Sequence, residues 1–340
     1  MARATPPDRP DRDGARRGRR AVIDVGSNSI RLVVFARAAD GGWRRLAARS
    51  ELVGLGGDLG SDGALSPARA ARALATLRAF AAVCAAHGIP RDRIAAVATS
   101  AVRDAPDGAA FVARARRATG LPLRIISPRE EAWYAYVAAV AHTSLRDGIV
   151  LDLGGGSLEL VAVRDRRARA LASWPLGAVR VSERFLPGDG PADPAALARL
   201  RAHAAAQLAG APWVAEAGRR RLVGLGGTVR TLAAAAIRAA ALERASVQGF
   251  VLAPDALAGL VARLAALPPS ARHRVPGIRR GRAGVILGGA VVLEATLAAT
   301  GAAGIEVVAA GLREGVLLAR ERDAAPLPPP DERPAPARRV

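Results

Sequence analysis

Two short segments of the chain each carry an aspartate directly before a turn of small residues. A gapless superposition relates AVIDVGSNSIRLVVF at 21–35 to IVLDLGGGSLELVAV at 149–163, which puts Asp24 and Asp152 in equivalent places 128 residues apart. Each copy has the pattern of a hairpin: an apolar strand, a turn, and a second apolar strand. An offset this long indicates two domains of related topology, because solenoid repeats recur every 20 to 50 residues or so.

The repeated turn predicts a phosphate site. Glycine and serine let several backbone N–H groups point at one place, and such a nest binds phosphate oxygens. An aspartate beside phosphate needs a divalent cation between them, and Mg²⁺ takes one or two carboxylates with phosphate oxygens and water. We expect Asp24 and Asp152 to hold Mg²⁺, or another divalent cation such as Mn²⁺. The expected phosphate ligands are Gly26, Ser27, Asn28, Ser29 and Arg31 in the first copy and Gly154, Gly155, Gly156 and Ser157 in the second.

A third glycine loop, LVGLGGTVRTLAA at 222–234, has the pattern of a strand, a loop and a helix start. Its spacing resembles a dinucleotide fingerprint, but Val229 stands where the third glycine belongs, and Glu159 does the same in the second hairpin. A Rossmann site is therefore disfavoured. A P-loop is excluded because its motif requires lysine and the chain contains none.

The elements that must position these loops alternate along the chain, which is typical of an α/β protein. A length of 340 residues suits two domains. Strands are predicted at 21–25, 31–36, 94–98, 123–126, 149–153, 159–163, 222–225 and 305–308, and helices at Pro67–His87, Glu130–Ala141, Pro194–Leu208 and Pro254–Leu267. The apolar stretch 285–304 contains Glu294 and four glycines, so we interpret it as buried strand and helix, not as a membrane span.

The charge of the chain points to a polyanionic partner. All 50 basic residues are arginine, and against 30 acidic residues they give a net charge of +20. Such a surplus favours nucleic acid, a membrane surface or a phosphate polymer, or it only makes the surface basic. Cys84 is the single cysteine, which excludes a disulfide within the chain and fits a reducing cytoplasm. The four histidines match no metal-site spacing.

The chain resembles the exopolyphosphatase and guanosine-pentaphosphate phosphatase family (Ppx/GppA), in the actin-like ATPase superfamily. The resemblance rests on seven segments in the family's order: VIDVGSNSIRLVVF at 22, VATSAVRDAPDG at 97, IISPREEAWYAY at 125, IVLDLGGGSLELV at 149, SWPLGAVRVSERFL at 173, GLGGTVRTL at 224 and AAGLREGVLL at 309. It implies an α/β fold with two ribonuclease-H-like, actin-like ATPase domains flanking an interdomain cleft. The chain matches the short form of the family, because no HD dipeptide of a third, C-terminal domain occurs.

Composition and the resemblance together set the expected domain bounds. Residues 1–20 and 324–340 are rich in proline, arginine and aspartate without hydrophobic periodicity, so we expect a disordered basic arm and a disordered tail rich in proline and arginine. The first domain would be 21–127 and the second 128–310. A C-terminal helix at about 311–322 is a candidate to pack back onto the first domain.

Roles for single residues follow from the same resemblance. Asp24 and Asp152 would hold the metal, the two hairpin turns would bind phosphates, and Arg103 would contact the polyanion. The resemblance implies that Glu130, the first acid of SPREEAW, is the catalytic carboxylate, which would orient and deprotonate the attacking water. Glu159 is a second catalytic candidate. Glu131 is expected only to stabilise a helix N-terminus. A candidate nucleoside loop comprises Gly226, Gly227 and Thr228.

Several functions remain open at this level. The first is Mg²⁺-dependent removal of terminal phosphate from inorganic polyphosphate, and the second is 5′-phosphate hydrolysis of guanosine pentaphosphate. A phosphotransferase related to acetate or sugar kinases and a non-catalytic sensor of polyphosphate or an alarmone are further alternatives. Leu158 stands where the family has a small hydroxylated residue, which is the one hint of a sensor. We expect no membrane and no specific nucleic acid as partner, a cytoplasmic location, and leave a homodimer open.

Overall fold

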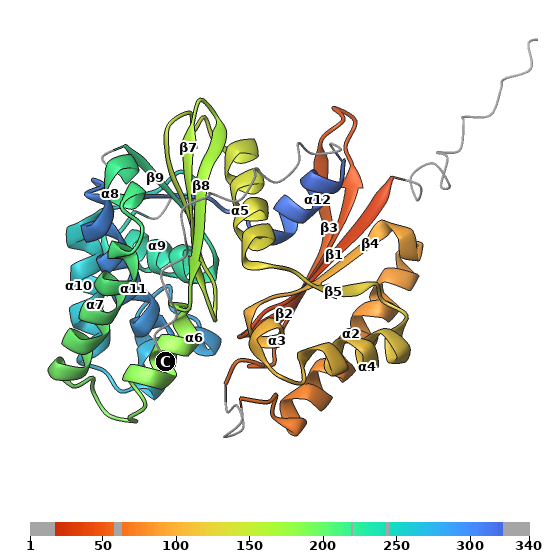
Figure 1. Ribbon diagram of the computed structural model, residues 1–340, viewed down its shortest axis with the longest axis horizontal. Coiled ribbons are helices and arrows are strands. Elements are labelled where there is room, and N and C mark those ends of the chain that lie inside the picture. The colour runs from red at the N-terminus through yellow and green to blue at the C-terminus, as the bar shows by residue number, and fades with distance from the viewer. Residues whose placement is uncertain (1–17, 58–62, 219, 243–244, 322–340) are drawn as a thin grey trace, which may run out of the picture.

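The computed structural model describes residues 18–57, 63–218, 220–242 and 245–321, which form two lobes, each built on one mixed sheet (Figure 1). Residues 1–17 of the predicted arm and the predicted tail at 324–340 lie outside the described residues. Arg19 and Arg20, the last residues of that arm, begin the first strand. The eight strands and four helices predicted by residue range are present, with ends within two residues of those expected.

The first lobe contains a five-stranded sheet. In sheet order its strands are β3 (Trp43–Leu52), β2 (Ser29–Arg37), β1 (Arg19–Val25), β4 (Ile94–Ala98) and β5 (Leu123–Ile125). Strands β1 to β3 pair antiparallel, whereas β4 and β5 continue from β1 in parallel. The helical segments of this lobe are α2 (Pro67–Ala86), η1 (Arg91–Arg93), α3 (Ser100–Asp104) and α4 (Gly108–Thr119).

The second lobe repeats this arrangement and adds one strand. In sheet order its strands are β10 (Val251–Leu252), β11 (Ile305–Val307), β9 (Arg221–Leu225), β6 (Gly148–Leu153), β7 (Leu158–Arg164) and β8 (Arg167–Trp174). Strands β6 to β8 pair antiparallel and β9 and β11 follow in parallel, as in the first lobe. The helical segments are α6 (Ala178–Phe185), α7 (Pro194–Ala209), α8 (Trp213–Gly218), α9 (Gly227–Ala239), α10 (Pro254–Ala265), η2 (Pro269–Arg274), η3 (Arg280–Arg282) and α11 (Ile286–Thr300).

Two further helices lie between the sheets. Helix α5 (Pro128–His142) covers the inner face of the second sheet, where its alanines pack on Val150 and Val161. Helix α12 (Leu312–Glu321) packs against α5 and covers the inner face of the first sheet, where Val316 and Leu317 join a cluster with Val22. The chain thus returns from the second sheet to the first at its end (Figure 1). Because strand side chains alternate between faces, Val22 lies under α12 whereas Ile23 lies in the cluster with α2 and α4.

One element differs from its prediction. The apolar stretch 285–304 forms the single helix α11, which ends at Gly301 in a left-handed conformation, and contains no strand. Alanine and leucine favour helix, and a run of 15 residues exceeds the usual length of a strand. Its neighbours bury 12 of its residues within the second lobe. In the described part of the chain, no helix has both the length and the apolarity that a membrane crossing requires.

Candidate active site

The two predicted turns face each other across a narrow polar pocket of about 80 Å³ between the lobes. The turns close in the same way: the Gly26 N–H donates to the Ser29 carbonyl at 3.2 Å, and the Gly154 N–H donates to the Ser157 carbonyl at 3.0 Å. The phosphate pocket, as we call it, includes eleven of the residues expected from the sequence: Asp24, Gly26, Ser27, Asn28, Ser29, Arg31, Asp152, Gly154, Gly155, Gly226 and Gly227. The structure therefore brings both hairpins and the third glycine loop to one place.

Three predicted residues lie just behind the lining. A Cβ on Gly156 would come within 2.1 Å of the Ser100 Oγ and 2.8 Å of the Ser27 Oγ, so glycine is required where the second turn meets the first lobe. The hydroxyls of Ser27 and Ser100 are themselves 3.0 Å apart. Ser157 and Thr228 are buried, with 4% and 0% of their surfaces exposed. Neither of these two hydroxyl side chains lines the pocket in this conformation.

Three carboxylates converge on the phosphate pocket: Asp24, Asp152 and Glu131. Asp24 is the next-to-last residue of β1, and Asp152 is the next-to-last residue of β6. Glu131 lies in the first turn of α5. Burial raises the pKa of Asp24, opposed by Arg313 and Arg31, and raises that of Asp152 to about 6, opposed by Arg230. Burial also raises the pKa of Glu131 to about 7, against the attraction of Arg103. The pocket therefore gathers carboxyl groups that a bound cation would stabilise.

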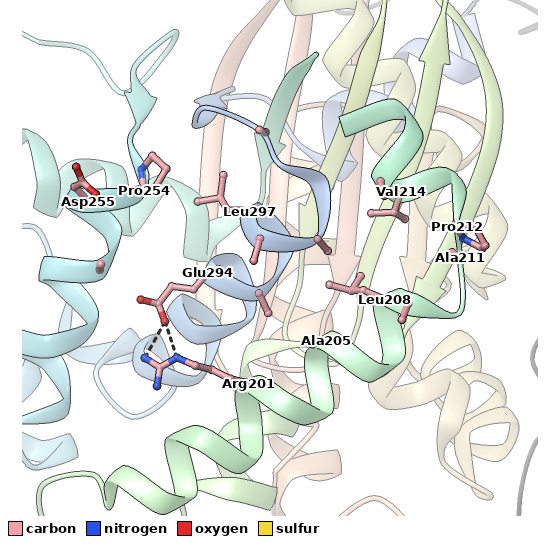
Figure 2. Close-up of a pocket in the computed structure, with 17 residues that line it drawn as sticks. Arg201, Ala205, Leu208, Ala211, Pro212, Val214, Pro254, Asp255, Glu294 and Leu297 are labelled. Carbon is pink, nitrogen blue, oxygen red and sulfur yellow. Dashed lines mark hydrogen bonds and ion pairs between the residues drawn. The ribbon is translucent and has the colours of Figure 1, made fainter. Parts of the chain in front are cut away.

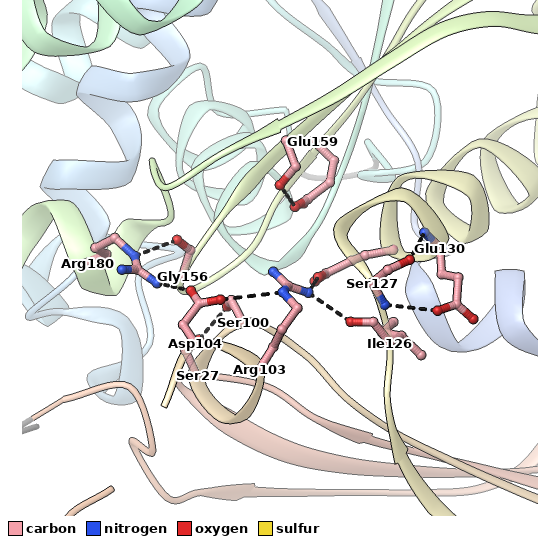
Figure 3. A network of polar contacts seen from close by, with 12 residues as sticks. Ser27, Ser100, Arg103, Asp104, Ile126, Ser127, Glu130, Gly156, Glu159 and Arg180 are labelled. Carbon is pink, nitrogen blue, oxygen red and sulfur yellow. Dashed lines mark hydrogen bonds and ion pairs between the residues drawn. The ribbon is translucent and has the colours of Figure 1, made fainter. Parts of the chain in front are cut away.

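Glu130, the predicted catalytic carboxylate, does not line this pocket. Its carboxylate accepts from the Ser127 N–H at 2.9 Å and from Arg124 at 2.6 Å, while its own N–H donates to the Ser127 hydroxyl at 3.1 Å. This reciprocal pair is a capping box at the start of α5. Burial tends to raise the pKa of Glu130, but Ser127 and Arg124 hold it below its usual value. Figure 3 shows Glu130 beside Ser127 and away from Ser27 and Ser100.

Glu130 thus has the capping position that we expected for Glu131, and Glu131 has the position in the pocket that we expected for Glu130. Glu130 is the third residue of α5, where a side chain can reach back to the cap, and Glu131 is one step further around the helix. The spacing Ser127-x-x-Glu130 is the sequence signal that identifies the capping residue. In the structure Glu131, and not Glu130, is the carboxylate that lines the pocket, and the catalytic role of either residue stays a prediction.

Arg103, the predicted polyanion contact, pairs with Glu131. Its Nη1 donates to Glu131 Oε2 at 2.8 Å and to the Ile126 carbonyl at 3.2 Å. Arg103 does not line the phosphate pocket, and its side chain is only 14% exposed. In this conformation the guanidinium therefore orients the carboxylate of Glu131.

Glu159 lies deeper than the other acids. It is 1% exposed, accepts from the Ser173 hydroxyl at 2.7 Å, and is opposite Asp152 in the β6–β7 pair. Burial, with repulsion from Glu131 and Asp152, raises its pKa well above the usual value. Arg31 holds the corresponding position in the first hairpin, opposite Asp24. The position opposite the aspartate is thus basic in the first hairpin and acidic in the second.

Arginines form the rest of the wall. Arg31, Arg230, Arg282 and Arg313 line the phosphate pocket, and of these only Arg31 was predicted from the sequence. Burial, with repulsion from neighbouring arginines, lowers the pKa of Arg230 to about 10 and that of Arg282 to about 9. Arg230, Arg282 and Arg313 lie in α9, η3 and α12, which are far apart in sequence, so no local motif contains all three. Two of the segments that carry the family resemblance contain such an arginine: GLGGTVRTL includes Arg230 and AAGLREGVLL includes Arg313.

A second cavity of about 400 Å³ continues from this wall. Seven of its 15 lining residues are arginines, which the two lobes share: Arg31, Arg45, Arg49, Arg230, Arg279, Arg282 and Arg313. Four of them also line the phosphate pocket. This arginine cavity therefore extends the positive surface away from the carboxylates.

A larger cavity lies elsewhere, in the second lobe among α7, α8, α10 and α11 (Figure 2). Its volume is about 870 Å³, and 14 of its 17 lining residues are apolar. Glu294 projects into it from α11 and accepts two hydrogen bonds from Arg201, at 3.0 and 3.2 Å. An apolar lining offers no nest of donors to phosphate, so size does not identify the site of the predicted chemistry.

The residues of the phosphate pocket suit a magnesium ion. Among the described residues, no group of three or more histidine, cysteine, aspartate or glutamate side chains is arranged to hold a metal by itself. Mg²⁺ does not require such a cage, since it commonly takes one or two carboxylates and fills its other positions with water and phosphate oxygens. Asp24 and Asp152 meet that demand on opposite walls of the pocket, next to the amide-rich turns.

Two related mixed sheets and a pocket formed by their equivalent hairpins define a protein with two ribonuclease-H-like domains of the actin-like ATPase class. Solved structures share this fold. A Ppx/GppA protein from Aquifex aeolicus matches with a TM-score of 0.73 and 29% identity, over 89% of this chain and 97% of that one. An exopolyphosphatase from Cytophaga hutchinsonii matches with a TM-score of 0.82 and 23% identity, over 90% of this chain and 99% of that one, which bears on the fold alone.

The chain belongs to the Ppx/GppA phosphatase family, whose model matches residues 33–323. Among curated proteins, exopolyphosphatase 1 of Mycobacterium tuberculosis is 31% identical over 304 residues, which cover 88% of this chain and 87% of that protein. The predicted family and fold are therefore confirmed, and the chain is a hydrolase of the phosphatase type.

Proposed function

We propose that the protein removes the terminal phosphate from inorganic polyphosphate in a Mg²⁺-dependent hydrolysis. The observation that carries the proposal is the position of Glu131, which faces the same small pocket as the two turns and both aspartates. A carboxylate there can orient a water molecule for in-line attack on a phosphorus held by the turns. Relatives named exopolyphosphatase support the same substrate.

Each group in the pocket then has a task. The backbone N–H groups of the turns around Gly26 and Gly154 would hold the oxygens of the terminal phosphate. Asp24 and Asp152 would hold Mg²⁺, which would neutralise charge on those oxygens. Glu131 would accept the proton of the water, and Arg103 would keep its carboxylate directed at the pocket. Glu159, buried behind Asp152, would support the metal side of the pocket.

The arginine cavity favours a phosphate polymer over a nucleotide. It begins at the wall of the phosphate pocket and presents guanidinium groups from both lobes, which suit a chain of repeated anionic units. None of the described residues that line either cavity is aromatic, so no ring is available to stack on a guanine base. The loop at Gly226 and Gly227 lies in the pocket wall and would contact phosphate instead of a nucleoside.

The deciding experiment measures phosphate release from purified protein with polyphosphate or with guanosine pentaphosphate, with and without Mg²⁺. We expect release from polyphosphate that requires the metal and a lower kcat/KM for the nucleotide. Faster release from the nucleotide would reassign the substrate. Release from neither substrate, with retained binding, would indicate a sensor, and transfer of labelled phosphate from ATP to an acceptor would indicate a phosphotransferase.

A further inference from the structure

One ion pair crosses between the lobes at the edge of the phosphate pocket. Asp104 ends α3 in the first lobe, and its Oδ2 accepts from the Nη2 of Arg180 on α6 of the second lobe. The other oxygen, Oδ1, lies 3.5 Å from the Nε of Arg103. Asp104 therefore contacts two arginines, one from each lobe, as Figure 3 shows.

On the second lobe, Arg180 is tied to the phosphate turn. Its Nε donates to the Gly156 carbonyl at 3.0 Å. The first turn of α6 holds the same loop from its backbone, since the Ala178 N–H donates to the Gly154 carbonyl and the Val179 N–H to the Gly155 carbonyl. The position of the Arg180 guanidinium is thus fixed relative to the second turn.

On the first lobe, the contacts lead to the pocket carboxylate. Arg103, next to Asp104 in α3, donates to Glu131 at 2.8 Å. A continuous line of contacts therefore joins Gly156 of the second turn, Arg180, Asp104, Arg103 and Glu131. It starts behind the second phosphate turn, at the Gly156 carbonyl, and ends at the carboxylate that would activate water.

We propose that Asp104 and Arg180 are positioning residues that couple closure of the two lobes to the orientation of Glu131; this role rests on the proposed hydrolysis. The pair is exposed enough to break and re-form, because the side chains of Asp104 and Arg180 are 44% and 37% accessible. When the lobes are apart, Asp104 loses Arg180 and Arg103 loses part of its support. When the lobes close, the Asp104–Arg180 pair forms and fixes the position of the Glu131 carboxylate relative to the second turn.

The test compares the charge-removing variants Asp104→Asn and Arg180→Gln and their double variant with wild-type protein. We expect each single variant to lower kcat for polyphosphate by about tenfold to a hundredfold, as for small misplacements of catalytic groups, with less change in KM. The double variant should lose less kcat than the product of the two single losses, because both substitutions break the Asp104–Arg180 contact. The conservative Asp104→Glu should recover part of kcat.

The matched control is Arg221→Gln with Glu306→Gln. This pair is 2.6 Å apart, similarly exposed on β9 and β11 of the second lobe, and remote from the line of contacts. Its variants should keep kcat. A loss of kcat of equal size in the control, or additive losses in the Asp104 and Arg180 double variant, would overturn the proposal.

A second readout does not need turnover. Spin labels at Ala79→Cys on α2 and Ala206→Cys on α7, both exposed positions, report the distance between the lobes. The native Cys84 is buried, which raises its pKa to about 11 and keeps it unreactive. With Mg²⁺ and a non-hydrolysable polyphosphate analogue, wild-type protein should show one narrow distance and Asp104→Asn a broad distribution. Identical distributions would contradict the coupling, whereas absence of phosphate release from wild type would contradict only the proposed function.

Discussion

Glu131 lies 2.8 Å from the Arg103 guanidinium at the wall of the phosphate pocket, whereas Glu130, the preceding residue, caps α5 and pairs with Arg124 outside it. The two side chains leave the same helix turn toward different partners. One therefore faces the expected substrate and the other stabilises the element that carries it.

This division predicts opposite outcomes for two neighbouring substitutions. Glu131→Gln should lower kcat by roughly 10²- to 10⁴-fold, the usual contribution of a general base, while polyphosphate still binds. Glu130→Gln should keep most of kcat and lower the free energy of unfolding by less than about 1 kcal/mol, because glutamine can still accept from the Ser127 N–H and only the ion pair with Arg124 is lost. Phosphate release and thermal denaturation separate the two effects. Loss of turnover in Glu130→Gln with full activity in Glu131→Gln would reverse the assignment.

The pH dependence of turnover provides a second prediction. Glu131 must be ionised to accept a proton, and its pKa is raised to about 7, so kcat should rise with pH over the neutral range and level off above it. Arg103 lowers this pKa, and Arg103→Gln should therefore move the rise to higher pH. A pH–rate profile of both proteins at saturating Mg²⁺ tests this. An unchanged midpoint in the variant would show that Glu131 is not the group observed.

Stability should depend on pH in the opposite direction. Asp152 and Glu131 have pKa values of about 6 and 7 in the folded chain, above their ordinary values of 3.8 and 4.5. Between pH 5 and 7.5 the folded state then binds more protons than the unfolded state, so metal-free protein should become more stable as pH falls, by up to about 1.4 kcal/mol per pH unit for each group within its range.

Addition of Mg²⁺ should flatten this dependence, because the cation replaces the protons on the pocket carboxylates. Urea denaturation at several pH values, with and without Mg²⁺, measures both slopes. His203 has the opposite effect on stability, because burial lowers its pKa and the folded state therefore binds fewer protons there than the unfolded state. It is one group against the two carboxyl groups. A stability that falls from pH 7.5 to pH 5 without metal would refute the prediction.

The arginine cavity predicts an effect of chain length. Arg49 and Arg279 line it without lining the phosphate pocket. Their substitution by alanine should raise KM for long polyphosphate several-fold and flatten its salt dependence, while tripolyphosphate, which would fill the phosphate pocket, is hardly affected. Arg146→Ala, at an exposed ion pair with Asp165, is the control. Equal effects on both substrates would show that the chain does not pass along this cavity.

The sequence alone predicts those residues of the site that lie close together in one segment, and it does not predict those that the fold brings together from distant elements. The two hairpins were predictable because aspartate, turn and apolar strands lie within 15 residues and occur twice. The choice between Glu130 and Glu131 depends on one helical step, because only the direction of the side chain decides which of them lines the pocket. Arg230, Arg282 and Arg313 were missed because the fold, not the sequence, brings three distant elements to one wall.

Strands β3 and β8 were also missed, and for a different reason. Both follow the second strand of a hairpin and are half exposed, with arginine and alanine where an apolar alternation would reveal a strand. Their partners β2 and β7 supply the hydrogen bonds that hold them. Pairing with a neighbour already in place outweighs weak local preference.

The return of α12 to the first lobe has a consequence for how the chain is made. Val316 and Leu317 cover the inner face of the first sheet, over Val22 and Val33, and these residues are almost 300 positions apart. During synthesis that face remains bare until α12 has left the ribosome. The N-terminal lobe would therefore complete its fold last, although its strands emerge first, and a nascent chain stalled before residue 312 should be a preferred client of chaperones that bind exposed apolar surface.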